Sequence, residues 1–210
     1  MAAERLIRER LCAARPQDAV LGEEGEDVSG TSGLRWVVDP LDGTVNFLFG
    51  IPQWAVSIAC EDAQATLAGV VLDPLRGECW TARRDGPALL GEEPVQGSAG
   101  TELGHALVAT GFAYDAELRR RQAGVLAQLL PRVRDVRRAG SAALDLAWTA
   151  AGRHDAYYER GVKPWDVAAG ALLCERAGLE LRPLAEGDGL PAGLLVAPPA
   201  LIDELLVLVS

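Results

Sequence analysis

Histidine and cysteine are scarce in this chain of 210 residues, and their placement excludes several kinds of site. The two histidines, His105 and His154, are too few for a zinc site built from imidazoles. The four cysteines are scattered without a Cys-x-x-Cys pair, at Cys12, Cys60, Cys79 and Cys174. No Gly-x-Ser-x-Gly segment is present to carry a serine nucleophile. Carboxylate chemistry is what remains.

Long apolar runs and blocks of basic residues are also missing. No apolar run approaches the roughly 18 residues that a membrane-spanning helix needs, and the first residues lack a signal-peptide pattern. The net charge is −10, which argues against nucleic acid as a partner. Scattered cysteines without a secretory signal are typical of reduced thiols. We therefore expect a cytoplasmic globular protein that binds neither membrane nor nucleic acid.

The most informative segment follows an apolar run at residues 34–38, which predicts a buried strand. Asp39 ends this strand, Pro40 interrupts its pattern, and Asp42 follows. Gly43 and Thr44 then predict a tight turn with free backbone N–H groups. Two carboxylates at this spacing suit a hard cation, and the neighbouring amides suit a phosphate oxygen. Asp-Pro and Asp-Gly also mark ordinary turns, so the segment needs support from elsewhere.

Two further acidic signals supply that support. Glu23 and Glu24 come directly after a short apolar run, and Asp166 falls in the first turn of a predicted helix that Pro164 opens. Taken singly, the glutamates would be a solvated loop, and Asp166 a charge favoured by the helix dipole. Three such elements in this order are hard to assign to chance.

With these motifs, the chain resembles the inositol monophosphatase family of Mg²⁺-dependent, lithium-sensitive phosphatases. The family pattern is Gly-Glu-Glu, then Asp-Pro-x-Asp-Gly-Thr, then Trp-Asp-x-Ala-Ala-Gly. Here the three motifs stand at residues 22–24, 39–44 and 165–170, and residues 138–143 and 155–161 also look like the family. The resemblance spans nearly the whole chain. It implies hydrolysis of a phosphate monoester, and the Ala-Tyr-Tyr-Glu run ending at Glu159 favours myo-inositol 1-phosphate.

The resemblance also implies roles for individual residues, with two or three Mg²⁺ ions as cofactors. The implied ligands of the first ion are Glu23, Asp39 and the backbone carbonyl of Leu41. Those of the second ion are Asp39, Asp42 and Asp166. Glu23 and Thr44 would orient the attacking water, and the amides of Gly43 and Thr44 would bind phosphate. The alcohol part of the substrate would lie against Gly140, Ser141, Ala142 and Glu159, although Ser141 also reads as a plain helix N-cap.

The pattern of elements predicts an α+β half followed by an α/β half. The first subdomain, residues 1–100, has an opening helix that ends before Pro16, strands at 19–21 and 34–38, and a β-meander at 54–60, 66–72, 78–82 and 88–90. The second, residues 101–210, follows a linker at 96–101. Its expected strands lie at 106–109, 133–137, 155–158, 179–181 and 194–197. Its expected helices lie at 116–130, 141–151, 164–177 and 199–209. The family's layered α-β-α-β-α sandwich is compatible with this order, and together the halves would form one catalytic unit.

Two alternatives to an inositol monophosphatase stay open, and a third is excluded. Histidinol-phosphate phosphatases, bisphosphate nucleotidases and fructose-1,6-bisphosphatases share the metal motifs. A non-catalytic, metal-binding remnant is a further reading, because the family has another segment upstream of what is here Met1. On that reading the third metal ion, a helical cover and part of the implied homodimer contact are in doubt, and the 210-residue form is expected to be incomplete. Phosphatases of the haloacid dehalogenase type use Asp-x-Asp, which Asp39 and Asp42 do not match.

Overall fold

Six α-helices and twelve strands form the regular structure of residues 2–210, the part of the chain that the computed structural model describes. The helices are α1 (Ala2–Ala14), α2 (Thr44–Leu48), α3 (Ala116–Leu129), α4 (Ala142–Ala150), α5 (Pro164–Arg176) and α6 (Ile202–Val209). The first seven strands are β1 (Ala19–Gly22), β2 (Arg35–Asp42), β3 (Ala55–Glu61), β4 (Thr66–Asp73), β5 (Glu78–Arg83), β6 (Leu89–Leu90) and β7 (Glu93–Pro94). The other five are β8 (Leu107–Thr110), β9 (Asp135–Arg137), β10 (Ala156–Arg160), β11 (Glu180–Leu184) and β12 (Gly193–Ala197). A single 3-10 turn covers Leu103–His105.

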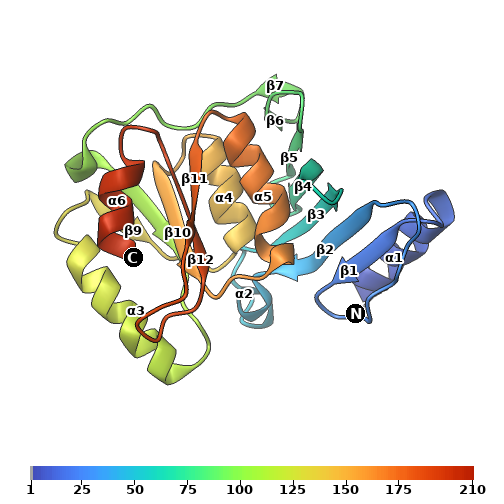
Figure 1. Ribbon diagram of the computed structural model, residues 1–210, viewed down its shortest axis with the longest axis horizontal. Coiled ribbons are helices and arrows are strands. Elements are labelled where there is room, and N and C mark those ends of the chain that lie inside the picture. Colours follow the sequence, from blue (N-terminus) through green and yellow to red (C-terminus); the bar gives the residue numbers. More distant parts are fainter. Residues whose placement is uncertain (1) are drawn as a thin grey trace.

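These elements stack in five layers, which are seen edge-on in Figure 1. Helix α1 lies outside the first sheet, α4 and α5 lie between the two sheets, and α3 and α6 lie outside the second sheet. The two buried cores lie on either side of the second sheet, one of them between the two sheets around α4 and α5, whereas α1 buries only Glu4. The α-β-α-β-α sandwich expected from the sequence is therefore confirmed.

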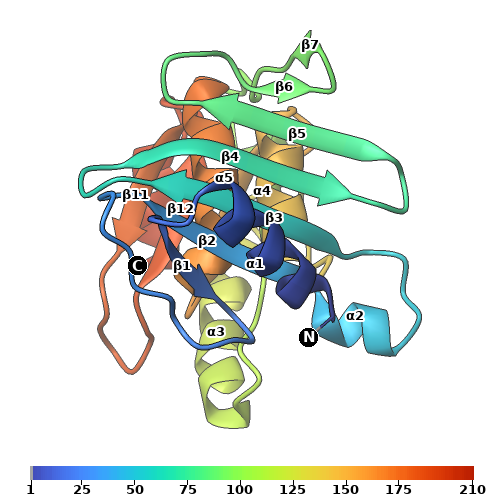
Figure 2. The ribbon, with the colours of Figure 1, turned by 90° about the vertical axis from the view of Figure 1, so that its right-hand side faces the viewer.

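The first sheet is a meander whose seven strands lie in sequence order, β1 to β7. All its neighbours are antiparallel except β1 and β2, which run parallel with Gly22 opposite Val38. Figure 2 shows α1 crossing one face of this sheet, while α4 and α5 lie behind it. Because β1 and β2 run parallel, their carboxyl ends lie side by side, and the acidic residues that follow each strand meet at one edge.

The second sheet has the order β11-β12-β10-β8-β9. Strands β8, β9 and β10 are mutually parallel, and β12 is antiparallel to both β10 and β11. Helices α3 and α4 link the parallel strands, as expected of crossover connections. The parallel part of this sheet directs the end of β10 toward the same cleft as the ends of β1 and β2, as described below.

Two glycines allow close packing around α5. A Cβ added at Gly69 of β4 would lie 2.9 Å from the Cα of Ala169 in α5, and one added at Gly170 would lie 2.5 Å from the Cβ of Leu146. Both distances are too short for a real side chain, so glycine is required at each position. Glycine at these two positions therefore lets α5 pack closely against β4 and against α4.

Most expected elements are present, and the differences have local causes. Strand β2 continues through Pro40 to Asp42 instead of ending at Asp39, because the proline falls in an irregular part of the ladder. The short helix α2, strand β7 and the 3-10 turn at 103–105 were not predicted. None is longer than five residues, which is too short for a periodic pattern to emerge. Within residues 2–210, no helix is long and apolar enough to cross a membrane.

Candidate metal and phosphate site

A bulge near the end of β2 brings two carboxylates to the same side. Asp39 pairs with Ser57 of β3, but the next pair joins Asp42 with Ala55, so β2 has one residue more than its partner over this stretch. In a regular strand, residues three apart point to opposite faces. The extra residue compensates for this alternation, and Asp39 and Asp42 both face the cleft. The sequence motif therefore depends on an irregular backbone.

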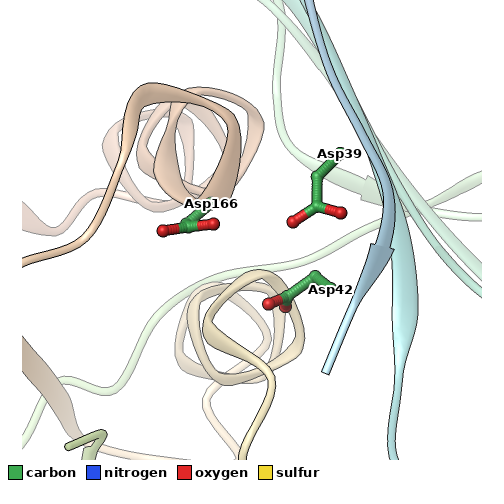
Figure 3. A group of neighbouring side chains, drawn as sticks. All are labelled: Asp39, Asp42 and Asp166. Atoms are coloured by element: carbon green, nitrogen blue, oxygen red, sulfur yellow. The ribbon is translucent and has the colours of Figure 1, made fainter. Parts of the chain in front are cut away.

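Asp39, Asp42 and Asp166 form a tight group of carboxylates. One oxygen from each lies within 4.8 Å of one from each of the others. Figure 3 shows the three side chains pointing toward a common space, two from the β2 end and one from α5. Burial, helped by the charges of Asp42 and Glu23, raises the pKa of the Asp39 carboxyl to about 9. Burial is the main cause that raises the pKa of Asp42 to about 7, and the charge of Asp166 adds to this shift. Burial also raises the pKa of Asp166.

The start of α4 anchors Asp42. The Ser141 hydroxyl donates to Asp42 Oδ2 over 2.5 Å, and the Ala143 amide donates to the same oxygen over 2.7 Å. Ser141 is also the N-cap of α4, since its Oγ accepts from the Leu144 amide over 3.3 Å. A carboxylate at a helix start is favoured by the exposed N–H groups and the helix dipole. The expected N-cap is thus present, and the same hydroxyl fixes Asp42.

The start of α5 positions Asp166 in a similar way. Pro164 opens the helix, and the Lys163 amide donates to Asp166 Oδ2 over 2.7 Å. The Ser57 hydroxyl donates to the Trp165 carbonyl over 3.2 Å, which ties this helix start to β3 beside Asp39. Because only Oδ2 of Asp166 caps α5, its other carboxylate oxygen is free to face Asp39 and Asp42.

Glu23 lines the same cleft but lies outside the tight group of three. It is exposed, and its amide donates to the Val38 carbonyl over 3.2 Å, so its backbone adjoins the residue before Asp39. Its charge helps raise the pKa of Asp39 and of Asp166. The structure thus brings together the four carboxylates implied as metal ligands, with three close together and one at the rim.

The turn after Asp42 requires a glycine and leads into α2. Gly43 has a φ of +95°, and a Cβ there would lie 2.9 Å from the Gln53 carbonyl oxygen. The Thr44 hydroxyl donates to the Leu41 carbonyl over 3.0 Å. The Asn46 side chain donates to the carbonyls of Gln53 and Ala139 over 2.7 and 2.9 Å. Asn46 therefore ties this turn to the segment that carries Gly140.

Glu159 stands at the end of β10 and faces the cleft from the second sheet. It accepts a hydrogen bond from the Tyr157 hydroxyl over 3.1 Å. Its carboxylate occupies the space that a side chain at position 111 would need, so Gly111 is required beside it. Burial raises the pKa of Glu159 to about 7, and the charge of Asp42 adds to this shift.

These residues share one cleft of about 530 Å³ between the two halves of the chain. Ten of the eleven predicted site residues lie along its wall: Glu23, Asp39, Leu41, Asp42, Gly43, Thr44, Gly140, Ala142, Glu159 and Asp166. The remaining one, Ser141, lies behind the wall and contacts it through Asp42. A cleft of this size, with polar groups converging on one end, is typical of a small-molecule site.

Sequence reasoning missed several groups in and behind this cleft. Arg138 and Lys163 add positive charge to its wall, and an apolar stretch includes Phe112 and Tyr114. Asp145 of α4 is 1% exposed, and its Oδ1 has no hydrogen-bond partner within residues 2–210. Burial raises its pKa, with a contribution from the charge of Glu159. No motif distinguished Asp145 from any other aspartate in a helix.

The carboxylates of this cleft suit divalent cations. Three clustered carboxylates with raised pKa values repel one another, and a cation among them would remove that cost. Carboxylates, a backbone carbonyl and water are the ligands that Mg²⁺ takes. With amides and cationic side chains beside them, the fold and the site define a metal-dependent phosphatase.

Comparison with known proteins agrees with this class. The sequence model of the inositol monophosphatase family matches residues 1–208. A Mycobacterium tuberculosis protein named inositol-1-monophosphatase SuhB is 47% identical over 215 residues, covering 97% of this chain and 73% of that protein. A Salmonella typhimurium relative named Nus factor SuhB is 42% identical over 179 residues, covering 84% of this chain and 67% of that protein.

A solved structure of the suhB protein from Bartonella henselae superimposes with a TM-score of 0.92 at 35% identity, covering all of this chain and 82% of that one. The chain therefore belongs to the inositol monophosphatase family. It is a phosphatase that hydrolyses phosphate monoesters.

Proposed function

We propose that this chain hydrolyses myo-inositol 1-phosphate to inositol and phosphate with two or three bound Mg²⁺ ions. The observation that carries the proposal is the group of Asp39, Asp42 and Asp166 at one end of a cleft, with Glu159 on the facing wall. The three aspartates suit metal ions and a phosphate, and Glu159 suits a polyol. The names of close relatives support the same substrate.

The metal ligands would be those that the motifs predict. Glu23, Asp39 and the Leu41 carbonyl would hold one ion, and Asp39, Asp42 and Asp166 a second. Bound Mg²⁺ supplies positive charge that makes water more acidic and offsets the charge of the phosphate. The Leu41 carbonyl already accepts from Thr44, and its second lone pair is available to a cation.

The remaining site residues would orient the reacting groups. Glu23 would accept a hydrogen bond from the attacking water, and the Thr44 oxygen would accept another, since its own proton goes to Leu41. The amides of Gly43 and Thr44 would donate to phosphate oxygens as charge develops on them. No covalent phosphoenzyme is needed on this route, because the nucleophile is water.

The alcohol part of the substrate would lie between two walls. Gly140, Ser141 and Ala142 at the start of α4 form one wall, and Glu159 would accept a hydrogen bond from an inositol hydroxyl across from it. An ionised carboxylate is the stronger acceptor, and its burial makes an unmatched substrate costly to bind. Glu159 would therefore determine substrate choice.

A second candidate is a nucleotide phosphatase, which the apolar part of the cleft favours. Its residues are Phe112, Tyr114, Leu118, Val162 and Pro191. Tyr114 is 78% exposed, so its ring is free to stack on a flat base. A polyol gains little from such a wall, whereas a nucleobase gains contact area.

Phosphate release from four substrates distinguishes these candidates: inositol 1-phosphate, histidinol phosphate, fructose 1,6-bisphosphate and adenosine 3′,5′-bisphosphate. Each would be measured with Mg²⁺ and again with EDTA. We expect the highest kcat/KM with inositol 1-phosphate and no release in EDTA. A preference for another substrate would reassign the alcohol site, and no Mg²⁺-dependent release from any of them would favour a non-catalytic protein.

We also propose that residues 1–100 and 101–210 are two subdomains of one catalytic unit that works as a cytoplasmic homodimer. The first sheet uses residues 19–94 and the second uses residues 107–197, with α4 and α5 packed against strands of both. A group of apolar side chains in and after α2 supports self-association: Val45, Phe47, Leu48, Phe49 and Ile51 are all exposed. Phe49 is 79% exposed, and contiguous apolar patches of this kind mark contact surfaces.

A further inference from the structure

Glu4 is the only buried residue of α1, although Ala3, Leu6, Ile7 and Leu11 recur at helical spacing and form an apolar stripe. It is 2% exposed, whereas Leu6 of that stripe is 54% exposed. A glutamate is almost never fully buried unless it is paired or hydrogen-bonded. Its partners therefore indicate why it is there.

Both oxygens of Glu4 accept backbone hydrogen bonds from the loop that carries Glu23. The Glu24 amide donates to Oε2 over 2.8 Å, and the Gly25 amide donates to Oε1 over 3.0 Å. Hydrogen bonds to an ionised acceptor are about twice as strong as neutral ones. One side chain thus orients two consecutive peptide groups directly after Glu23.

Arg8, one turn further along α1, holds the same loop, and Glu4 and Arg8 together form a clamp on it. Its Nε donates to Glu4 Oε1 over 2.6 Å, and its Nη1 donates to the Glu26 carbonyl over 2.9 Å. The side chains of the pair are 3% and 15% exposed, so the guanidinium offsets a charge that has little access to water. The loop is therefore held by residues 4 and 8 together.

The loop is also shaped to receive these two side chains. A Cβ at Gly25 would lie 2.9 Å from Glu4 Oε1, and one at Gly22 would overlap both Glu4 and Arg8. On the opposite side, the Glu23 amide donates to the Val38 carbonyl. Glu23 is therefore fixed on one flank by β2 and on the other by α1, although its own side chain is exposed.

We infer that Glu4 is a positioning residue, which holds the 23–26 loop so that the Glu23 carboxylate faces Asp39 and Asp166. The inference rests on the proposed role of Glu23 as a metal ligand. Glu4 touches neither the substrate nor the reacting atoms. It reduces the number of conformations that the loop must lose when Glu23 binds a cation, and residues that orient metal ligands typically contribute about 10- to 100-fold to metal affinity or activity.

The test is Glu4→Gln, with Glu9→Gln as the matched control. Both changes remove one negative charge from α1, but Glu9 is 65% exposed and has only a 3.8 Å ion pair with Arg5. In Glu4→Gln, an NH2 group takes the place of one carboxylate oxygen, so one of the two loop N–H groups loses its acceptor. The measurements are calorimetric titration with Mg²⁺ alone, the Mg²⁺ concentration for half-maximal activity, and the ¹H–¹⁵N signals of Glu24 and Gly25.

We expect Glu4→Gln to bind Mg²⁺ about tenfold more weakly, to need correspondingly more Mg²⁺ for activity, and to shift both amide signals. KM for the phosphate ester at saturating Mg²⁺ should change little, and Glu9→Gln should behave like the parent protein. Unchanged Mg²⁺ affinity in folded Glu4→Gln would overturn the inference, even if its melting temperature fell. Should Glu4→Gln fail to fold, Glu4→Asp keeps the charge on a shorter stem, and the same two outcomes apply to it.

The calorimetric titration needs no substrate, so it separates this inference from the proposed function. A parent protein that binds Mg²⁺ but releases no phosphate from inositol 1-phosphate would refute the substrate and leave the role of Glu4 intact. If Glu4→Gln binds Mg²⁺ as tightly as the parent protein and the parent hydrolyses inositol 1-phosphate normally, the role of Glu4 is refuted and the substrate assignment stands.

Discussion

The Asp42 side of the cleft and the Glu23 side differ in how much of the chain holds them. Asp42 is bound by the start of α4, and Asp166 belongs to α5, whose body lies buried between two sheets. Glu23 lies in an exposed loop, and the element outside the sheet that holds it is α1, which buries a single residue. The first side is anchored by the core of the molecule, and the second by a clamp at its surface.

This difference indicates a division of labour. Asp42 and Asp166 are fixed by helix starts, and Asp39 is fixed by its place in β2 and by the Leu41 amide, which donates to its Oδ1 over 2.9 Å. These three groups must approach one another against repulsion, and they cannot move without disturbing the core. Glu23 at the rim has only its backbone held, by β2 and α1, while its side chain is exposed. Substitution of Asp39, Asp42 or Asp166 should therefore abolish the reaction. Substitution of Glu23, or of a residue that holds its loop, should weaken individual steps.

The largest effect should come from Asp42→Asn. It removes a charge from the centre of the group, and the new amide nitrogen either faces the donors Ser141 and Ala143 or replaces the oxygen that would face a cation. We expect kcat/KM for inositol 1-phosphate with Mg²⁺ to fall by roughly a thousandfold or more. Asp203→Asn, an exposed change of the same kind on α6, is the control and should leave the rate unaltered. Near-normal turnover in Asp42→Asn would mean that the metal assignment is wrong, and Asp39→Asn should fail in the same way.

A smaller and selective effect is expected at Glu159, on the wall that faces the alcohol. Glu159→Gln should lower kcat/KM for inositol 1-phosphate by about ten- to a hundredfold, since a hydrogen bond to a charged group contributes roughly 1.5–3 kcal/mol. The same variant should lose little activity on a simple alcohol phosphate, which offers no hydroxyl to this carboxylate. Equal losses on both substrates would remove Glu159 from the specificity site and favour the histidinol-phosphate alternative.

Ser141→Ala tests the anchoring of Asp42 without touching a metal ligand. It removes one of two donors to Asp42 Oδ2 and the N-cap of α4. We expect about a tenfold loss of activity and a loss of about 1 kcal/mol in the free energy of unfolding. Ser141→Thr, which retains the hydroxyl, should restore most of the activity and most of the stability. Ser29→Ala at an exposed site is the control. An Ala variant with full activity and lowered stability would leave Ser141 as a helix cap only.

The smallest effect concerns pH and stability in the absence of metal. The folded-state pKa values of Asp39 and Asp42, about 9 and about 7, lie above the unfolded value. The folded protein therefore holds more protons than the unfolded chain, and the stability contributed by these carboxyls is lost as pH rises through 7 and then 9. In EDTA, the melting temperature should fall by a few degrees between pH 6 and pH 9.

Mg²⁺ should reverse that decline, because it binds the ionised carboxylates and only in the folded state. Its stabilising effect should therefore be larger at pH 9 than at pH 6. Asp39→Asn removes the more strongly shifted of these two carboxyls and should flatten the pH profile in EDTA. A melting temperature that rises with pH in the metal-free parent protein would contradict the assigned direction.

Much of the fold followed from periodicity and turn residues. The meander at residues 54–90 and the alternation of strands and helices after residue 105 were predicted within a few residues, because each element is long enough to show its period or is bounded by glycine or proline. Helix α2 was missed, since five residues beginning at Thr44 show no period, and Gly43 reads equally well as an isolated turn. The apolar stripe of α1 suggested a buried face, but the buried side chain is Glu4.

The motifs by themselves singled out Glu23, Asp39, Asp42 and Asp166, and all four line one cleft in the structure. They did not determine how those side chains meet. The bulge in β2, the grip of Ser141 on Asp42 and the clamp of Glu4 on the 23–26 loop each join residues that are distant in sequence or break the regular period of a strand. Local patterns report local conformation, whereas such contacts exist only once layers have packed and buried charges must find partners. The tertiary structure alone therefore decided which residues hold the site in place.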